Sequence, residues 1–116
     1  MKKILYCEDD KFCADAFSKG FSRIGYEVFT LLSRPSEIKD KVNQTIKDFN
    51  PDMIIIDSLE GLCFSTIEIA LDTDTKIIPI VFSGKDSILE EAKSKNYLAY
   101  NKDDWMGLYE YLEKLK

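Results

Sequence analysis

The sequence predicts one α/β domain in which a parallel sheet of five strands is covered by helices on both faces. Two apolar runs, residues 53–56 and 77–82, are continuous rather than alternating, which is typical of strands buried on both faces. Strand-like and helix-like segments alternate five times along the chain, as in a doubly wound sheet with right-handed crossovers. The 116 residues contain no linker or repeat, so a single domain over residues 1–116 is expected.

The N-terminal part begins with a short buried strand, expected over residues 4–7. Asp10 is placed to cap the helix that follows, because its carboxylate can accept the free N–H groups of the first turn. The apolar residues of that helix recur at i, i+3 and i+4 from Cys13 to Ile24, and Gly25 then breaks the pattern. The first strand and helix are therefore both expected to pack against one core.

The middle of the chain repeats the same alternation. A second and more exposed strand is expected over residues 26–30. Pro35 begins the next helix, and the dipeptide Asn50-Pro51 ends it before the third strand. The helix after that strand, within residues 64–71, is expected to be short.

The C-terminal part supplies the last two strands and helices. Pro79 lies inside the fourth strand and removes one donor from the ladder, which is acceptable if pairing begins near that residue. Ser87 is expected to cap a short helix, and a last strand follows over residues 97–100. The terminal helix has an apolar stripe that starts at Trp105.

Composition excludes several classes of function. Sixteen Lys and Arg against 21 Asp and Glu give a net charge of -5, which argues against binding to a nucleic-acid backbone. The chain has no histidine, which removes Ser/His and Cys/His nucleophiles and the HExxH zinc site. Three cysteines without CxxC spacing predict neither a zinc site nor a disulfide framework. No signal peptide and no membrane span of ~20 apolar residues is expected, so a cytoplasmic protein is predicted.

Polar residues follow the predicted strands at the edge where ligands bind in doubly wound sheets. The first strand ends in Glu8 and Asp9, the third in Asp57, the fourth in Ser83, and the fifth near Lys102. Carboxylates gathered in this way repel one another unless a cation lies among them. Hard oxygen ligands of this kind suit Mg²⁺, so a magnesium site is predicted at Glu8, Asp9 and Asp57.

These residues resemble the receiver domain of two-component response regulators over almost the whole chain. The segment KILYCEDD supplies the family's acidic pair, PDMIIID its phosphoacceptor aspartate, IPIVFSG its hydroxyl residue and YLAYNK its lysine. The four motifs occur in the family's order, each at the expected strand end. The resemblance implies a flavodoxin-like strand order, 2-1-3-4-5.

The resemblance also implies a role for each residue. Asp57 would be the nucleophile that becomes an aspartyl phosphate, with Mg²⁺ held by Asp9 and Asp57 and by Glu8 directly or through water. Lys102 would pair with one phosphoryl oxygen, and Ser83 would donate a hydrogen bond to another. The implied partners are a sensor histidine kinase or phosphotransfer protein as donor and an output protein as receiver of the signal. No enzyme activity is expected beyond self-catalysed phosphotransfer and autodephosphorylation.

Three positions depart from the family pattern. The loop after Asp57 lacks the usual Met-Pro pair and is expected to be shortened, which leaves metal coordination by its backbone carbonyl open. Asp103 replaces the proline that usually follows the lysine, which argues against a cis peptide bond there. Ala99 stands where the family has an aromatic residue, and Tyr100, one place later, should point to the opposite face of the strand.

Two functional classes therefore remain open, with a third less favoured. The first is a stand-alone receiver, monomeric or weakly dimeric, that switches a protein partner on phosphorylation, because 116 residues leave no room for an output domain. The second is a pseudo-receiver, an interaction module that keeps the fold and the acidic pocket without phospho-switching. The third is a flavodoxin-like binder of a nucleotide or flavin, which is disfavoured because no glycine-rich phosphate loop follows the first strand.

Overall fold

The computed structural model describes residues 2–116 and contains one sheet of five parallel strands in the order β2-β1-β3-β4-β5. This order confirms the fold predicted from the sequence. Each pair of neighbours is parallel, so all five strands end at the same edge of the sheet. The strands are β1 (Lys3–Glu8), β2 (Glu27–Leu32), β3 (Met53–Ile56), β4 (Ile78–Ser83) and β5 (Leu98–Asn101).

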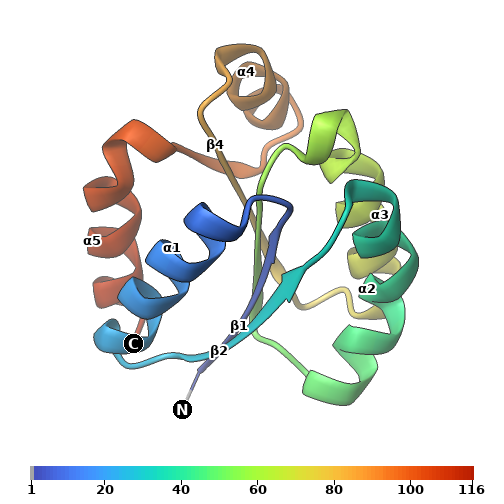
Figure 1. The fold of residues 1–116 in the computed structure, drawn as a ribbon, viewed down its shortest axis with the longest axis horizontal. Coiled ribbons are helices and arrows are strands. Elements are labelled where there is room, and N and C mark those ends of the chain that lie inside the picture. The colour runs from blue at the N-terminus through green and yellow to red at the C-terminus, as the bar shows by residue number, and fades with distance from the viewer. Residues whose placement is uncertain (1) are drawn as a thin grey trace.

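Five helices cover the sheet in two layers (Figure 1). One face carries α1 (Lys11–Ile24) and α5 (Trp105–Leu115), and the other carries α2 (Pro35–Phe49), α3 (Cys63–Thr73) and α4 (Asp86–Ser94). Two short 3-10 turns, η1 (Leu59–Gly61) and η2 (Lys102–Asp104), follow β3 and β5. Within residues 2–116, none of the helices combines the length and the apolar character that crossing a membrane requires.

Two apolar clusters, one on each face of the sheet, form the core. Alternation along β1 explains how one strand serves both: Ile4 and Tyr6 face α1 and α5, whereas Leu5 and Cys7 face α2 and α3. All four residues of β3 are buried, as expected for a central strand with helices on both sides. The continuous apolar runs in the sequence therefore reflect this double burial.

Strand and helix ends agree with the predicted signals at most positions. Asp10 caps α1, and its Oδ1 accepts the N–H groups of Phe12 at 2.8 Å and Cys13 at 3.2 Å. Pro79 lies one residue inside β4, where the paired part of the strand begins, as the sequence required. Gly25 ends α1 with a φ of 120°, a conformation that favours glycine.

Two predictions about helix ends were wrong. Ser87 does not cap α4, because the helix begins at Asp86 and the capping position belongs to Lys85. The hydroxyl of Ser83 accepts the N–H of Lys85 at 3.1 Å and so turns the chain into the helix earlier than expected. Trp105 does not belong to the buried stripe of α5: it is 42% exposed and packs edge-on against Tyr109 beside the cleft between α1 and α5.

Candidate functional site

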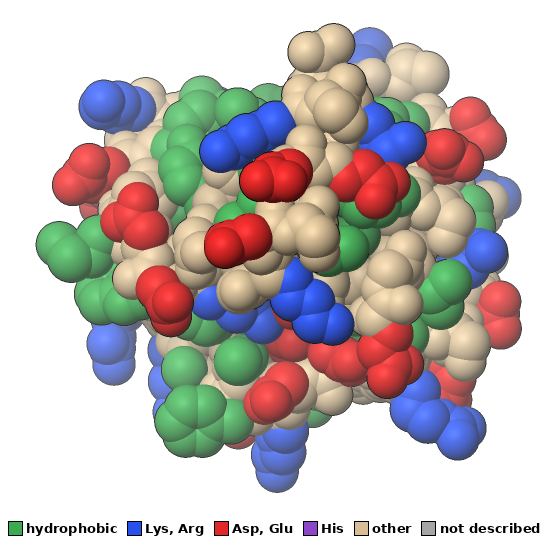
Figure 2. All heavy atoms as spheres, turned by 90° about the horizontal axis from the view of Figure 1, so that it is seen from above, with side chains coloured by type: hydrophobic (Ala, Val, Ile, Leu, Met, Phe, Trp, Pro, Cys, Tyr) green, Lys and Arg blue, Asp and Glu red, His purple; other side chains and the backbone are tan. Residues whose placement is uncertain are grey.

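The residues predicted for the site gather at the carboxyl edge of the sheet. Glu8 is the last residue of β1, Asp57 directly follows β3, Ser83 is the last residue of β4, and Lys102 directly follows β5. Asp9 stands between β1 and α1. Seen from above this edge, acidic and basic side chains lie interspersed among hydrophobic ones (Figure 2).

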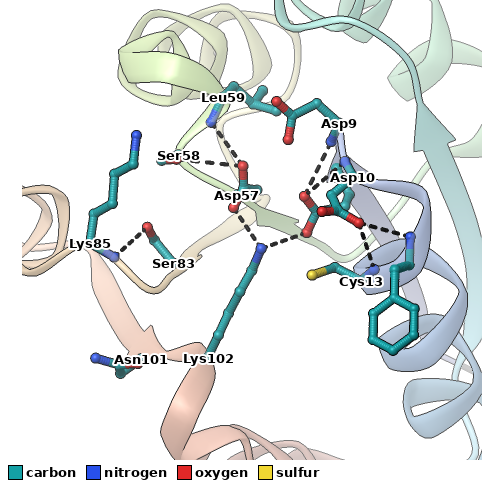
Figure 3. Close-up of polar contacts among 12 residues, drawn as sticks. Asp9, Asp10, Cys13, Asp57, Ser58, Leu59, Ser83, Lys85, Asn101 and Lys102 are labelled. Carbon is teal, nitrogen blue, oxygen red and sulfur yellow. Dashed lines mark hydrogen bonds and ion pairs between the residues drawn. The ribbon is translucent and has the colours of Figure 1, made fainter.

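Lys102 joins the two buried carboxylates of the site (Figure 3). Its Nζ lies 2.7 Å from Asp57 Oδ1 and 2.9 Å from Glu8 Oε1. The lysine side chain is 18% exposed, while the side chains of Glu8 and Asp57 are 0% and 12% exposed. Because water has little access to this group of charges, the ammonium ion is the main partner that compensates the two carboxylates.

Glu8 is held by donors on both of its oxygens. Oε1 accepts the Tyr6 hydroxyl at 2.8 Å in addition to the Lys102 ammonium group. Oε2 accepts the backbone N–H groups of Asp9 at 3.2 Å and Asp10 at 3.3 Å. A carboxylate offers about four acceptor positions, so the Glu8 carboxylate is fully satisfied from within the protein.

The second oxygen of Asp57, Oδ2, accepts hydrogen bonds from the loop that follows the residue. The N–H of Leu59 donates to Asp57 Oδ2 at 3.1 Å, and the Ser58 hydroxyl lies 3.5 Å from the same oxygen. Leu59, Glu60 and Gly61 have φ values of 49°, 54° and 93°. A left-handed conformation costs a non-glycine residue on the order of 1–2 kcal/mol. In return it aims the Leu59 N–H at Asp57 and buries the Leu59 side chain in the core.

The carboxylates of Glu8, Asp9 and Asp57 form a cluster that could hold a cation. Each offers one oxygen, and these oxygens lie within 4.8 Å of one another. In Figure 3 the Asp9 carboxylate and the Lys102 ammonium group lie on opposite sides of Asp57. A donor set of carboxylate oxygens fits Mg²⁺, and Asp9 with Asp57 would hold the ion, since the lone pairs of Glu8 already have partners.

Burial and the ammonium group act in opposite directions on the site's carboxyl groups. Burial raises the pKa of Glu8, although hydrogen bonds from Lys102 and Tyr6 partly oppose this. Burial and then the charge of Asp57 raise the pKa of Asp9. Burial also acts to raise the pKa of Asp57, but the hydrogen bonds from Lys102 and the Leu59 N–H outweigh it, so its pKa is lowered. The Lys102 ammonium group and the Leu59 N–H therefore favour the ionised form of Asp57.

Ser83 lies on the side of Asp57 away from α1 (Figure 3). The residue is 1% exposed, and its Oγ accepts the N–H of Lys85 at 3.1 Å. The hydroxyl acts as an acceptor in this contact, which leaves its proton available as a donor. The predicted role of Ser83 toward a group on Asp57 remains a prediction.

The side chains of Ala99 and Tyr100 lie on opposite faces of β5, as the sequence predicts. Ala99 pairs with Val81 and packs on the face of α3 and α4. Tyr100 packs on the opposite face, where its ring centroid lies 6.0 Å from that of Tyr111. Within residues 2–116 every peptide bond is trans, including the one between Lys102 and Asp103.

A cleft of about 440 Å³ opens beside Asp9. The start of α2 and the loop after β3 form its walls, lined by Arg34, Pro35, Ser36, Glu60 and Leu62. A wider cleft of about 560 Å³ lies between α1 and α5, around Phe17 and Trp105, and contains none of the predicted site residues. Access to the exposed side of the acidic cluster is therefore from α2 and η1.

Two contributions to the site were not found from the sequence. The Tyr6 hydroxyl reaches Glu8 because residues two apart on a strand share a face, so the pair Tyr6 and Glu8 was a usable signal. The Leu59 N–H reaches Asp57 only through a left-handed backbone, for which a leucine gives no signal. The thiols of Cys7 and Cys63 are buried and that of Cys13 is half-buried, and all three are free.

Comparison with known proteins gives the fold a name. No family model matches the sequence, and no curated protein is significantly similar to it. Among solved structures, the signal receiver domain of the response regulator MerR from Colwellia psychrerythraea is 19% identical, with a TM-score of 0.70, over 99% of this chain and 98% of that one. The receiver domain of NtrC4 from Aquifex aeolicus is 20% identical, with a TM-score of 0.63, over 86% and 80%.

The chain has the receiver fold. The same fold occurs in CpaE from Burkholderia thailandensis, a protein assigned to pilus assembly, with a TM-score of 0.76 and 17% identity over 98% of this chain and 97% of that one. At these identities the likeness concerns the fold.

Proposed function

We propose that this receiver-fold domain accepts a phosphoryl group on Asp57 and passes the change to a protein partner. The observation that carries the proposal is the pocket at the carboxyl edge of the sheet. There Lys102 contacts Asp57 at 2.7 Å and Glu8 at 2.9 Å, and the Asp9 carboxylate completes an acidic cluster. A surface ion pair needs no such burial, whereas a phosphoryl acceptor needs an ionised carboxylate beside fixed positive charge.

The proposed reaction is a displacement at phosphorus. One Asp57 oxygen forms a bond to the phosphorus atom while the bond from phosphorus to the donor's nitrogen or oxygen breaks, and the leaving group keeps that electron pair and takes up a proton. Lys102 can follow the negative charge from the carboxylate to a phosphoryl oxygen, and Ser83 can donate its hydroxyl proton to another. When bound at Asp9 and Asp57, Mg²⁺ would offset charge on the transferred group.

The donor and the receiver of the signal belong to the same proposal. A phosphohistidine on a sensor kinase or a phosphotransfer protein is the donor that the family resemblance implies, in the cytoplasm. The cleft beside Asp9 gives a donor a route to the acidic cluster. The output is a protein partner, which would recognise the loops around Asp57 and Ser83.

A pseudo-receiver is the second candidate function, and one observation favours it. Every buried side-chain nitrogen and oxygen in residues 2–116 has a hydrogen-bond partner, those of Glu8 and Asp57 included. Lys102 therefore completes the pocket internally. With Ala99 in place of an aromatic residue, such a domain could bind its partner constitutively.

Uptake of beryllofluoride, a phosphoryl mimic, separates the two functions. Fluorine NMR of the protein with beryllofluoride should show bound signals that require both Mg²⁺ and the Asp57 carboxylate. EDTA and Asp57→Asn should each remove the signals. Wild-type protein without bound signals at saturating Mg²⁺ would reject the phosphoacceptor and leave the pseudo-receiver.

A further inference from the structure

A buried tyrosine is an integral part of the acidic pocket. Tyr6 is 0% exposed, and its hydroxyl donates to Glu8 Oε1, the same oxygen that accepts Lys102. A buried tyrosine O–H group usually finds a hydrogen-bond partner, and for Tyr26 that partner is the backbone carbonyl of Leu112. The Tyr6 hydroxyl instead contacts a fully buried carboxylate at the centre of the site.

We propose that Tyr6 is a positioning residue: by holding Glu8 Oε1, it fixes the ammonium group of Lys102 between Glu8 and Asp57. The consequence of this for phosphoryl transfer rests on the function proposed above. The effect of Tyr6 on the position of Lys102 does not depend on that function. The same hydrogen bond makes Glu8 an internal anchor for Lys102.

The geometry restricts both partners of the Tyr6–Glu8 contact. They stand two residues apart on β1 and so on one face of the strand, and the Tyr6 ring packs edge-on against Phe21 at 5.3 Å. The second oxygen of Glu8 is held by the N–H groups of Asp9 and Asp10. Glu8 can therefore neither rotate away nor follow Lys102.

Lys102 depends on this fixed acceptor because its own stem is flexible. A lysine ammonium group is a point charge on four methylene groups and can move wherever acceptors allow. Its two acceptors are Glu8 Oε1 and Asp57 Oδ1, and only the first is fixed by a side chain from the core. Loss of the tyrosine hydroxyl leaves Lys102 as the one donor to Glu8 Oε1, so that this oxygen is no longer held in place from the core.

Tyr6→Phe removes the hydroxyl and keeps the ring, and Tyr26→Phe is its matched control. Tyr26 is also buried, at 3% exposure, and its hydroxyl donates to the Leu112 carbonyl at 2.7 Å, in contact with none of the site residues. Each variant loses one buried hydrogen bond of a tyrosine hydroxyl, so the two should lose stability to a similar extent. A difference between them therefore reports on the pocket rather than on general stability.

The first measurement follows the ammonium protons of Lys102 by proton–nitrogen NMR, with the signal assigned by its absence in Lys102→Met. In metal-free protein we expect their exchange with water to be about tenfold faster in Tyr6→Phe, which corresponds to about 1.4 kcal/mol of lost protection. Tyr26→Phe should match the wild type. Unchanged exchange in Tyr6→Phe, or an equal increase in both variants, would overturn the positioning role.

The second measurement is the rate of labelling by phosphoramidate with Mg²⁺. A displaced Lys102 should lower the maximal rate in Tyr6→Phe and leave the concentration of donor at half-maximal rate unchanged. Equal maximal rates in Tyr6→Phe and Tyr26→Phe would overturn the role of Tyr6 in transfer. A wild type that is not labelled would overturn the proposed function, while the exchange measurement would still decide the position of Lys102.

A third measurement needs no variant and applies if Tyr6→Phe does not fold. The Tyr6 hydroxyl and the Lys102 ammonium group donate to one oxygen, at 2.8 and 2.9 Å. Their protons should therefore show a nuclear Overhauser effect in the wild type. Its absence, with both signals observed, would overturn the proposal.

Discussion

Replacing Lys102 with methionine tests how the pocket is held together. The variant keeps most of the aliphatic stem and removes the charge that lies 2.7 Å from Asp57 and 2.9 Å from Glu8. Removing one partner of a buried ion pair costs about 3–5 kcal/mol, because the remaining charge is left without compensation. Since the Lys102 side chain is 18% exposed, we expect the lower end, a loss of about 3 kcal/mol in the free energy of unfolding.

Urea denaturation at pH 7 with EDTA measures this loss, and Lys95→Met is the control. Lys95 lies 3.8 Å from Glu91, and both side chains are about half exposed, so its removal should change the free energy of unfolding by less than about 1 kcal/mol. The double variant Lys102→Met with Glu8→Gln should recover much of the stability, because the uncompensated Glu8 charge is then absent. Added Mg²⁺ should stabilise Lys102→Met more than the wild type.

Equal urea midpoints for Lys102→Met and Lys95→Met would contradict this role of Lys102. That result would mean that water or local rearrangement compensates the carboxylates, and that Lys102 does not hold the pocket. No recovery in the double variant would show that packing, rather than charge, is what the lysine supplies.

Three further predictions concern the acidic cluster, the contact between α1 and α5, and the output. Asp9 has a raised pKa in the folded state, so it contributes stability below its unfolded value of about 3.9 that is lost as pH rises through the folded pKa. Metal-free Asp9→Asn should therefore be more stable than wild type at pH 7, and its urea midpoint should rise less between pH 7 and about pH 4. Gly20→Ala should lower the free energy of unfolding by about 1–3 kcal/mol in the same assay, because a Cβ at this position would clash with the Tyr109 ring. Gly84→Ala is the control, because a Cβ at Gly84 would meet open space. Beryllofluoride should shift backbone amides near Ser83 and Gly84 and leave Tyr100 and Leu108 little changed, since Ala99 has no ring to carry the change; equal shifts at both places would contradict this.

The fold could be predicted from the spacing of apolar residues, because this spacing follows which side chains are buried. The uninterrupted apolar run 53–56 belongs to a strand buried on both faces, and the helical stripes belong to helices that cover the sheet. The ends of helices were harder to predict. Ser87 has the residue type of a cap, but the turn at Ser83 and Lys85 had already started the helix.

The candidate site could also be predicted only in part. Parallel strands bring their ends together, so listing the polar residues at those ends was enough to place Glu8, Asp57, Ser83 and Lys102 at one edge. Contacts that depend on side-chain reach or on unusual backbone angles did not follow. The Tyr6 hydroxyl on Glu8 is a contact of the first kind, and the left-handed Leu59 is one of the second.

Covalent labelling is the most direct test of Asp57 as the phosphoacceptor. Intact-mass spectrometry after incubation with acetyl phosphate or phosphoramidate and Mg²⁺ should show one added phosphoryl group on the wild type and none on Asp57→Asn. Asp10→Asn is the control, because Asp10 is a neighbouring carboxylate that caps α1, a task asparagine also performs, and it should be labelled as the wild type is. An unlabelled wild type, or equal labelling of Asp57→Asn, would contradict the assignment of Asp57 as the phosphoacceptor.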